Sequence, residues 1–358
     1  MIGRTAAVAF CGAALLLGVE IPMRDGVRLS ADIYGADPAL RKPVLLARTP
    51  YDKTGLKQRA EQYARHGYAV VIQDCRGRYA SKGVYVPYNN DKQDGYDTLD
   101  WIQRQPWSNG RVGMFGGSHL GVVQWLAAAE KAPGLVAIAP AVAPSSLYRV
   151  AYRAGVLRLA LISSGGTRAN DPPPNRTLPS GIDLLHYHLP LLFTPLARLE
   201  EAFGWPLPWM TSLLEHPVRD GFWNQTSAEE AIPDSVIPVQ ILSGYYDFFH
   251  HDSVQDFERL RRRKPSRPVQ LILGPWTHGG NNRTRTQDVD FGPDAAFDDF
   301  AGNLEWFDRF VKQAANTPYP LVRYFSMGDN KWFQAAEWPP RGTAPVSFYL
   351  HAGSQAGA

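Results

Sequence analysis

Short apolar runs alternate with longer amphipathic segments along most of the chain. Six runs rich in β-branched residues predict strands at 43–48, 69–74, 112–115, 136–140, 236–243 and 269–273. Apolar residues at helical spacing predict helices over 91–104, 120–131, 253–264 and 296–312. Strands that alternate with helices in this way form a doubly wound parallel sheet, so the pattern predicts an α/β fold.

This alternation stops between Ser145 and Asp234. Proline-rich and aromatic segments replace it, such as Phe203-Gly-Trp-Pro-Leu-Pro-Trp-Met210. We expect residues 145–234 to form a helical cap, inserted between the two parts of the core at 19–144 and 235–315. An insertion at this point follows a parallel strand, so the cap should cover the sheet edge where α/β proteins bind ligands.

The first residues follow a different pattern. The charged start Met1-Ile-Gly-Arg4 and the apolar run 5–18 resemble a secretory signal and favour export. No small-residue cleavage site follows, and a strand is predicted to begin at Val19. In the alternative interpretation, residues 1–18 pack on the sheet and the protein is cytoplasmic.

Composition and charge exclude several function classes. With 358 residues, 44% of them apolar, the chain can bury a large core. A net charge of +3 predicts no nucleic-acid partner, although the run Arg259-Leu-Arg-Arg-Arg-Lys264 is locally basic. The two cysteines, Cys11 and Cys75, give no disulfide framework.

One strand pattern runs directly into glycines around a serine. The segment Gly116-Gly-Ser118-His-Leu-Gly121 follows the strand at 112–115 and precedes a helix pattern. This order is typical of a nucleophile elbow, in which a sharp turn presents the serine hydroxyl. The motif G-x-S-x-G has glycine where this chain has Leu120, so the segment alone also fits a plain Gly-Ser turn.

An elbow serine needs a histidine base and an acid that orients the histidine. Asp247 follows the strand at 236–243, and His278 follows the strand at 269–273. Loops at the carboxyl ends of parallel strands meet at one sheet edge, and the order Ser, Asp, His fits this fold. We therefore predict the triad Ser118, Asp247 and His278. Asp252 and Asp256 are expected instead to cap or solvate the following helix. His250 and His251 lie too close to Asp247 in sequence to be its triad partner, and we expect them to be solvated loop residues.

Several motifs together resemble the cocaine-esterase-like family of α/β-hydrolases, which is similar to Xaa-Pro dipeptidyl-peptidases and α-amino-acid ester hydrolases. They are Arg48-Thr-Pro-Tyr51-Asp-Lys53, the elbow, Gly244-Tyr-Tyr-Asp247 and Gly274-Pro-Trp-Thr-His278. The resemblance runs from about Val19 to the last residues. It implies a serine acyl hydrolase in which the Tyr51 hydroxyl and the His119 backbone N–H bind the oxyanion. The family usually has tyrosine at position 119, but the backbone N–H is independent of that side chain.

The last part of the chain, 316–358, resembles the start of the C-terminal β-sandwich of that family. Its segments 319–327 and 345–351 predict strands whose sheet is not completed. Such strands would leave backbone donors and apolar faces unpaired, so we expect self-association through them. The sequence fits either a truncated fragment or a short natural form.

We expect a serine esterase or amidase that acts on a small-molecule ester or amide through an acyl-enzyme, without a cofactor. An alternative is a dipeptidyl-peptidase-like or α-amino-acid ester hydrolase activity, which would need carboxylates to bind a substrate ammonium. Another is a non-catalytic fragment. We expect no metal, because the clusters His186-Tyr-His188 and His250-His251-Asp252 lack cysteine partners and an H-E-x-x-H helix.

Overall fold

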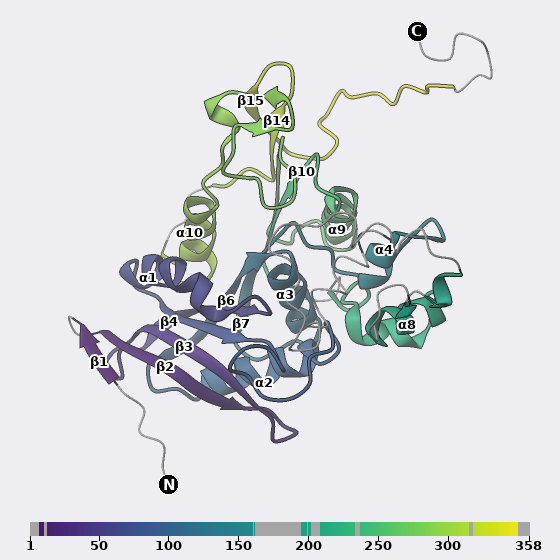
Figure 1. The fold of residues 1–358 in the computed structure, drawn as a ribbon. Coiled ribbons are helices and arrows are strands. Elements are labelled where there is room, and N and C mark those ends of the chain that lie inside the picture. The colour runs from purple at the N-terminus through teal and green to yellow at the C-terminus, as the bar shows by residue number, and fades with distance from the viewer. Residues whose placement is uncertain are drawn as a thin grey trace.

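The computed structural model describes residues 7–10, 13–159, 161, 195–198, 200–201, 208–232, 237–314 and 318–349. Its centre is an 11-stranded sheet (Figure 1). In spatial order the strands are β1 (Ala7–Phe10), β2 (Ala13–Pro22), β3 (Arg28–Ala36), β5 (Ala69–Asp74), β4 (Lys42–Thr49), β6 (Ser108–Gly117), β7 (Leu135–Ala141), β10 (Val239–Gly244), β11 (Val269–Gly274), β14 (Val322–Ser326) and β15 (Lys331–Ala335).

All six strands predicted from the sequence form, and they are parallel neighbours from β5 to β11. The α/β fold is therefore confirmed, but the sheet is mixed. The strands β1, β2 and β3 and the last strand, β15, pair antiparallel. A tight turn at Met23–Val27 joins β2 to β3, and so short a connection permits only antiparallel pairing.

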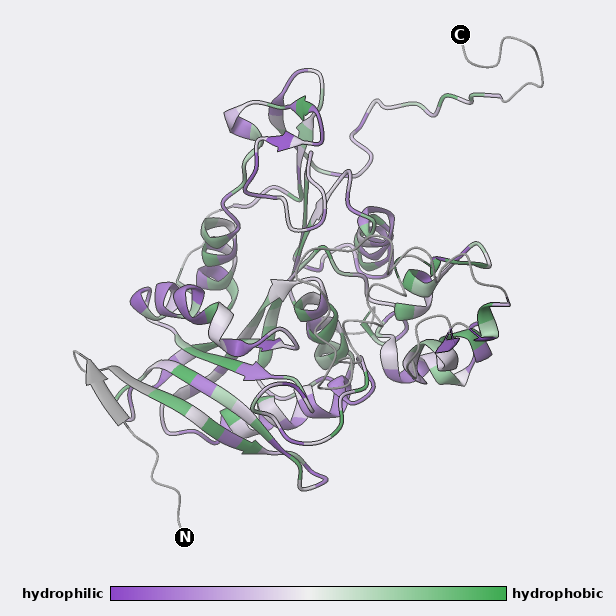
Figure 2. Cartoon of the chain, viewed as in Figure 1, coloured by the Kyte–Doolittle hydropathy of each residue, from purple (hydrophilic) through white to green (hydrophobic). Residues whose placement is uncertain are grey.

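Helices cover both faces of the sheet. The helices α2 (Asp91–Gln103), α3 (His119–Ala129) and α9 (His250–Arg263) pack on one face, in a core that includes Trp125 and Phe257. The helices α1 (Lys57–Arg65) and α10 (Asp299–Phe310) pack on the other, around Tyr63 and Phe307. Figure 2 shows α3 mostly hydrophobic and α1 mostly hydrophilic, because every α3 residue is buried whereas α1 exposes one side.

The described part of 145–234 consists of short elements beside the sheet (Figure 1). They are α4 (Leu147–Ala151), β8 (Tyr152–Arg153), β9 (Val156–Leu157), η3 (Leu196–Arg198), α8 (Pro208–Glu215) and η4 (Gly221–Thr226). All of them except η3 contribute to a separate apolar cluster that includes Trp209 and Trp223. The boundaries of the cap stay a prediction, and the segment with His186 and His188 lies outside the described residues.

The apolar N-terminal run overlaps the edge of the sheet. β1 and β2 include part of residues 5–18, and β2 begins before Val19. Among the described residues, no helix has the length and apolar character needed to span a bilayer. Export of this protein stays a prediction.

The strand predicted at 319–327 does not lack a sheet, and that expectation was wrong. β14 pairs in parallel with β11, and its side chains Val322 and Phe325 are buried, so it extends the α/β core. The described residues 345–349 form no strand, and Phe348 is 92% exposed. The sandwich start and self-association through this exposed segment stay predictions.

The remaining short elements are η1 (Lys53–Leu56), β12 (Arg285–Thr286), β13 (Val289–Asp290) and η6 (Pro293–Ala295).

Candidate active site

Ser118 occupies the turn between β6 and α3. Its φ of 57° and ψ of −124° lie outside the regions that residues with a side chain usually adopt, so the backbone is strained. Hydrogen bonds hold this conformation: the Ser118 N–H donates to the Ala141 carbonyl at 2.9 Å, and the Ser118 carbonyl accepts from the N–H groups of Gly121 and Val122. The segment has the strained strand–turn–helix geometry that a nucleophile elbow requires.

The glycine that follows the elbow, Gly121, has a packing role. A Cβ at this position would lie 2.3 Å from the Cβ of Ala143, so only glycine lets α3 approach the chain that follows β7. Leu120 stands where the usual motif has glycine, and it is buried without difficulty. The shift of the glycine by one position is therefore compatible with the turn.

The predicted acid and histidine are in contact. The His278 Nδ1 lies 2.6 Å from the Asp247 Oδ2, and the Asp247 Oδ1 accepts a hydrogen bond from the Phe249 N–H at 2.6 Å. The carboxylate is fully buried, whereas the histidine side chain is 27% exposed. This arrangement fixes the ring and leaves Nε2 as the nitrogen available to a second partner.

Backbone hydrogen bonds continue beyond the ends of the parallel strands. The Val142 N–H after β7 donates to the Leu242 carbonyl in β10 at 2.7 Å. The Tyr245 N–H after β10 donates to the Gly274 carbonyl at the end of β11 at 2.8 Å. Together with the elbow's bond to β7, these contacts join the loops of Ser118, Asp247 and His278 along one sheet edge.

A tryptophan of the histidine loop, Trp276, packs against the start of the acid loop. Gly244 and Gly274 are register partners at the ends of β10 and β11. A Cβ on Gly244 would lie 2.2 Å from the Trp276 carbonyl oxygen, and a Cβ on Gly274 would lie 2.3 Å from the Trp276 ring. The indole N–H donates to the Ala295 carbonyl at 2.6 Å. Gly274 thus makes room for the buried Trp276 ring, and Gly244 makes room for the Trp276 backbone carbonyl.

Tyr51 lies on the loop after β4, where its side chain is half exposed. Its ring meets the His119 ring edge-on, with 6.2 Å between the centroids. A buried hydrogen bond holds the backbone of this loop, because the Lys53 N–H donates to the Asp74 carboxylate at 2.8 Å. The structure thus places the Tyr51 and His119 rings in contact, and the roles of the Tyr51 hydroxyl and the His119 N–H as oxyanion donors stay predictions.

The His119 side chain is buried in a polar pocket beside the elbow. Its ring stacks on Tyr88 at 4.1 Å, and its Nε2 lies 3.5 Å from the Asp91 Oδ2. Arg48, which is also fully buried, contacts the other Asp91 oxygen at 3.0 Å. Burial would raise the pKa of Asp91, but the Arg48 guanidinium and His119 outweigh it, so this pKa is lowered.

Arg48 and Asp91 were not predicted from the sequence as supports of the elbow. A signal was present: an arginine at the end of an apolar, buried-type strand requires a carboxylate partner. Its partner lies 43 residues away in sequence and could not be chosen from the pattern alone.

One group of possible metal ligands comes together among the described residues: Cys75, Asp91 and His119. Burial raises the pKa of the Cys75 thiol far above its usual range, so the thiol carries its proton. Arg48 already supplies the positive charge that Asp91 requires. These residues fit a neutralised core cluster better than a cation site, and we assign them no metal.

Asp252 and Asp256 do not cap or solvate α9, so that expectation was wrong. Both are buried and form ion pairs with Arg149 of α4. Asp256 also accepts from the Ser145 N–H at 2.8 Å. Burial raises the pKa of Asp252 to about 6, although Arg149 opposes this shift. These carboxylates join the start of the cap to the helix after Asp247.

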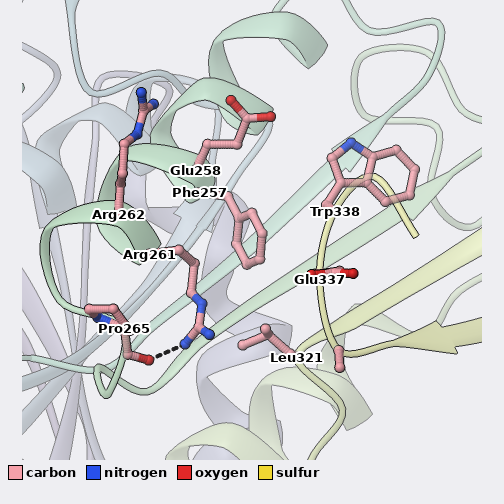
Figure 3. Close-up of a pocket in the computed structure, with 9 residues that line it drawn as sticks. Phe257, Glu258, Arg261, Arg262, Pro265, Leu321, Glu337 and Trp338 are labelled. Atoms are coloured by element: carbon pink, nitrogen blue, oxygen red, sulfur yellow. Dashed lines mark hydrogen bonds between the residues drawn. The ribbon is translucent and has the colours of Figure 1, made fainter. Parts of the chain in front are cut away.

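Two cavities lie near these elements. One of about 500 Å³ separates the loop 84–89 from the cap and is lined largely by apolar side chains, among them Tyr85, Leu147, Trp209 and Phe222. The other, of about 480 Å³, lies between α9 and the segment after β15, with Arg261, Arg262 and Trp338 on its walls (Figure 3). Ser118, Asp247 and His278 are not among the described residues that line either cavity.

Known proteins resemble this chain over most of its length. A cocaine esterase from Rhodococcus sp. (strain MB1 Bresler) is 37% identical over 361 residues, covering 93% of this chain and 61% of that protein. An aminopeptidase from a marine sediment Thaumarchaeota archaeon has a TM-score of 0.73 at 25% identity, covering 90% of this chain and 59% of that one. An α-amino acid ester hydrolase has a TM-score of 0.74 at 24% identity, with 95% and 61% covered. The chain spans about three fifths of the length of these relatives.

Residues 25–280 match the family described as X-Pro dipeptidyl-peptidase (S15 family). The chain therefore belongs to this family. The resemblance to the cocaine-esterase-like hydrolases and the α/β-hydrolase fold, both expected from the sequence, are confirmed.

Proposed function

We propose that this member of the S15 family is a serine acyl hydrolase that cleaves small esters through an acyl-enzyme. In this proposal Ser118 is the nucleophile, His278 the general base and Asp247 the residue that orients the base. The main support is the buried 2.6 Å contact between Asp247 and His278, on the same sheet edge as the strained Ser118.

The reaction would proceed in two steps, acylation of Ser118 and hydrolysis of the acyl-enzyme. The Ser118 Oγ bonds to the ester carbonyl carbon while its proton passes to the His278 Nε2, and the tetrahedral oxyanion accepts hydrogen bonds from the Tyr51 hydroxyl and the His119 N–H. The alcohol then leaves with the proton from His278. Water repeats the sequence on the acyl-enzyme, which releases the acid and restores Ser118.

The cavity of about 500 Å³ between the loop 84–89 and the predicted cap is our candidate for the site that binds an apolar or aromatic substrate group. Its wall includes Tyr85, whose ring lies 6.3 Å from the His119 ring, so the cavity is linked to the elbow through one side chain. Its volume suits a small-molecule group. No Asp or Glu is among its described lining residues. This favours a neutral ester over a substrate with a free ammonium, which a dipeptidyl-peptidase or an α-amino-acid ester hydrolase would bind.

Two measurements test this proposal. A fluorophosphonate probe should label the protein at Ser118, and the Ser118→Ala variant should not be labelled. The purified protein should hydrolyse p-nitrophenyl acyl esters faster than α-amino-acid esters or Xaa-Pro anilides. Faster cleavage of the Xaa-Pro anilide would favour the peptidase alternative. Absence of both labelling and turnover in a folded protein would favour the non-catalytic alternative.

A further inference from the structure

We propose that Arg158 and Phe248 form a clamp that holds the His278 ring in its working orientation, and that Arg158 is the positioning residue by which the cap supports the base. We call these two side chains the Arg158–Phe248 clamp. The inference rests on the proposed role of His278.

The first contact of the clamp is between two rings. The Phe248 ring stacks on the His278 ring, with 4.4 Å between centroids and 23° between planes. Phe249 meets the same imidazole edge-on at 5.5 Å. Since Asp247 binds Nδ1, three consecutive residues contact the ring at one nitrogen, one face and one edge. An aromatic face also stabilises the imidazolium that forms when His278 takes the serine proton.

Packing alone does not fix Phe248. Its side chain is 39% exposed, so it lacks the dense contacts that hold a core aromatic residue. The Arg158 Nη2 donates to the Phe248 carbonyl at 2.7 Å, and this bond restrains the backbone that carries the ring. Arg158 lies just after β9, in the predicted cap, 90 residues from Phe248 in sequence.

Arg158 is itself held by the ion-pair network between the cap and α9. Its Nη1 lies 3.7 Å from the Asp252 Oδ2, and its side chain is only 18% exposed. Asp252 is shared with Arg149, which also pairs with Asp256 and Glu229. A partly buried guanidinium restrained on the carboxylate side can direct its other N–H groups at one carbonyl. The cap is thus connected to the base through Asp252, Arg158 and Phe248.

Substitutions that remove one contact at a time test the clamp. Phe248→Leu and Arg158→Met should each lower kcat for a p-nitrophenyl ester about tenfold while KM changes less than about twofold, because ring orientation matters most in the transition state. Phe248→Tyr keeps the stacked ring and should stay close to wild type. The double variant should be no worse than either single variant, since both act through one contact chain.

Matched controls separate positioning from general damage. Tyr246→Leu removes a similarly exposed aromatic residue on the other side of Asp247, and Arg41→Met removes an exposed cation that is not among the charged groups acting on Asp252. Neither should change kcat by more than about twofold, and thermal unfolding of all variants should stay within a few degrees of wild type.

A second readout does not depend on turnover. In protein labelled with 15N-histidine, the Nδ1 proton between His278 and Asp247 should give a distinct low-field NMR signal. That signal should weaken in Phe248→Leu and Arg158→Met and persist in the controls. Wild-type kcat together with an unchanged signal in both clamp variants would overturn the clamp. If the wild type hydrolyses none of the esters and Ser118 is not labelled, the proposed function fails, while the NMR signal still decides whether the clamp orders His278.

Discussion

The two halves of the candidate active site are held in different ways. The elbow half is fixed by backbone hydrogen bonds and close packing around Ser118 and Gly121, with α3 buried along its whole length. The acid–histidine half is fixed by side chains that converge from distant segments, including Phe248, Arg158 and the carboxylate of Asp252. The turn at Ser118 is thus encoded mainly by neighbouring residues, with Arg48 and Asp91 as distant supports of His119, whereas the orientation of His278 depends on contacts that only the complete fold creates.

Loss of the nucleophile is the largest effect that we expect. Ser118→Ala removes one oxygen from the elbow and should lower kcat at least about 10⁴-fold, since the remaining site can only bind and polarise the ester. Urea unfolding should show little change in stability. Steady-state kinetics with active-site titration would measure the loss. A Ser118→Ala variant that keeps turnover near the wild-type level would contradict the assignment of the elbow.

Removal of the Tyr51 hydroxyl comes next. Tyr51→Phe should lower kcat about 10²–10³-fold with a small change in KM, because the hydroxyl binds the oxyanion better than the ground-state carbonyl. The edge-on ring contact with His119 should survive the change. A comparable control is Tyr79→Phe, since Tyr79 is also exposed. Equal losses in kcat and 1/KM would indicate a role in binding or packing instead.

The free energy of unfolding should depend on pH through Asp252, which supports the acid–histidine half. Arg149, Arg153, Arg158 and Asp256 face its carboxyl group, and burial raises its pKa from 3.8 to about 6. Because the folded state keeps the proton longer than the unfolded state, the free energy of unfolding should fall as pH rises from about 4 to 6. At about 1.4 kcal/mol per pKa unit the fall approaches 3 kcal/mol.

Asp252→Asn removes this titration, so the stability of the variant relative to wild type should increase over the same pH range. Urea unfolding at closely spaced pH values would measure the difference, with the exposed Asp288→Asn as control. The elbow should be unaffected, because its contacts do not include Asp252. A stability difference that is constant from pH 4 to 7 would show that Asp252 does not titrate in this range.

The smallest expected effect tests packing in the elbow half. Gly121→Ala would force its new methyl group against Ala143 and should destabilise the fold by about 1–3 kcal/mol, as overpacked sites usually do. Gly55→Ala is a matched control, since an added Cβ there meets nothing within 4 Å. Equal stabilities of the two variants would mean that α3 can shift to accommodate a side chain.

The same contrast explains how much of the fold and of the candidate site could be predicted from the sequence. The six parallel strands and the elbow were visible in the sequence because each depends on a local pattern. Asp247 and His278 could be found because each directly follows a strand. The ion pairs of Asp252 and Asp256 could not be predicted, since Arg149 lies about a hundred residues away in sequence and any arginine could have been the partner. The pairing of β14 with β11 was missed because strand neighbours are not specified by apolar pattern alone.

The glycine pair at the ends of β10 and β11 restricts how this edge can evolve. Gly244 and Gly274 lie side by side, and both accommodate Trp276. Gly274 makes room for the Trp276 ring, so a larger residue at 274 is excluded while the tryptophan remains. Gly244 makes room for the Trp276 carbonyl group, which every residue carries, so no substitution at 276 would permit a side chain at 244. Positions 274 and 276 can therefore change as a pair, whereas Gly244 is fixed by the backbone of the histidine loop.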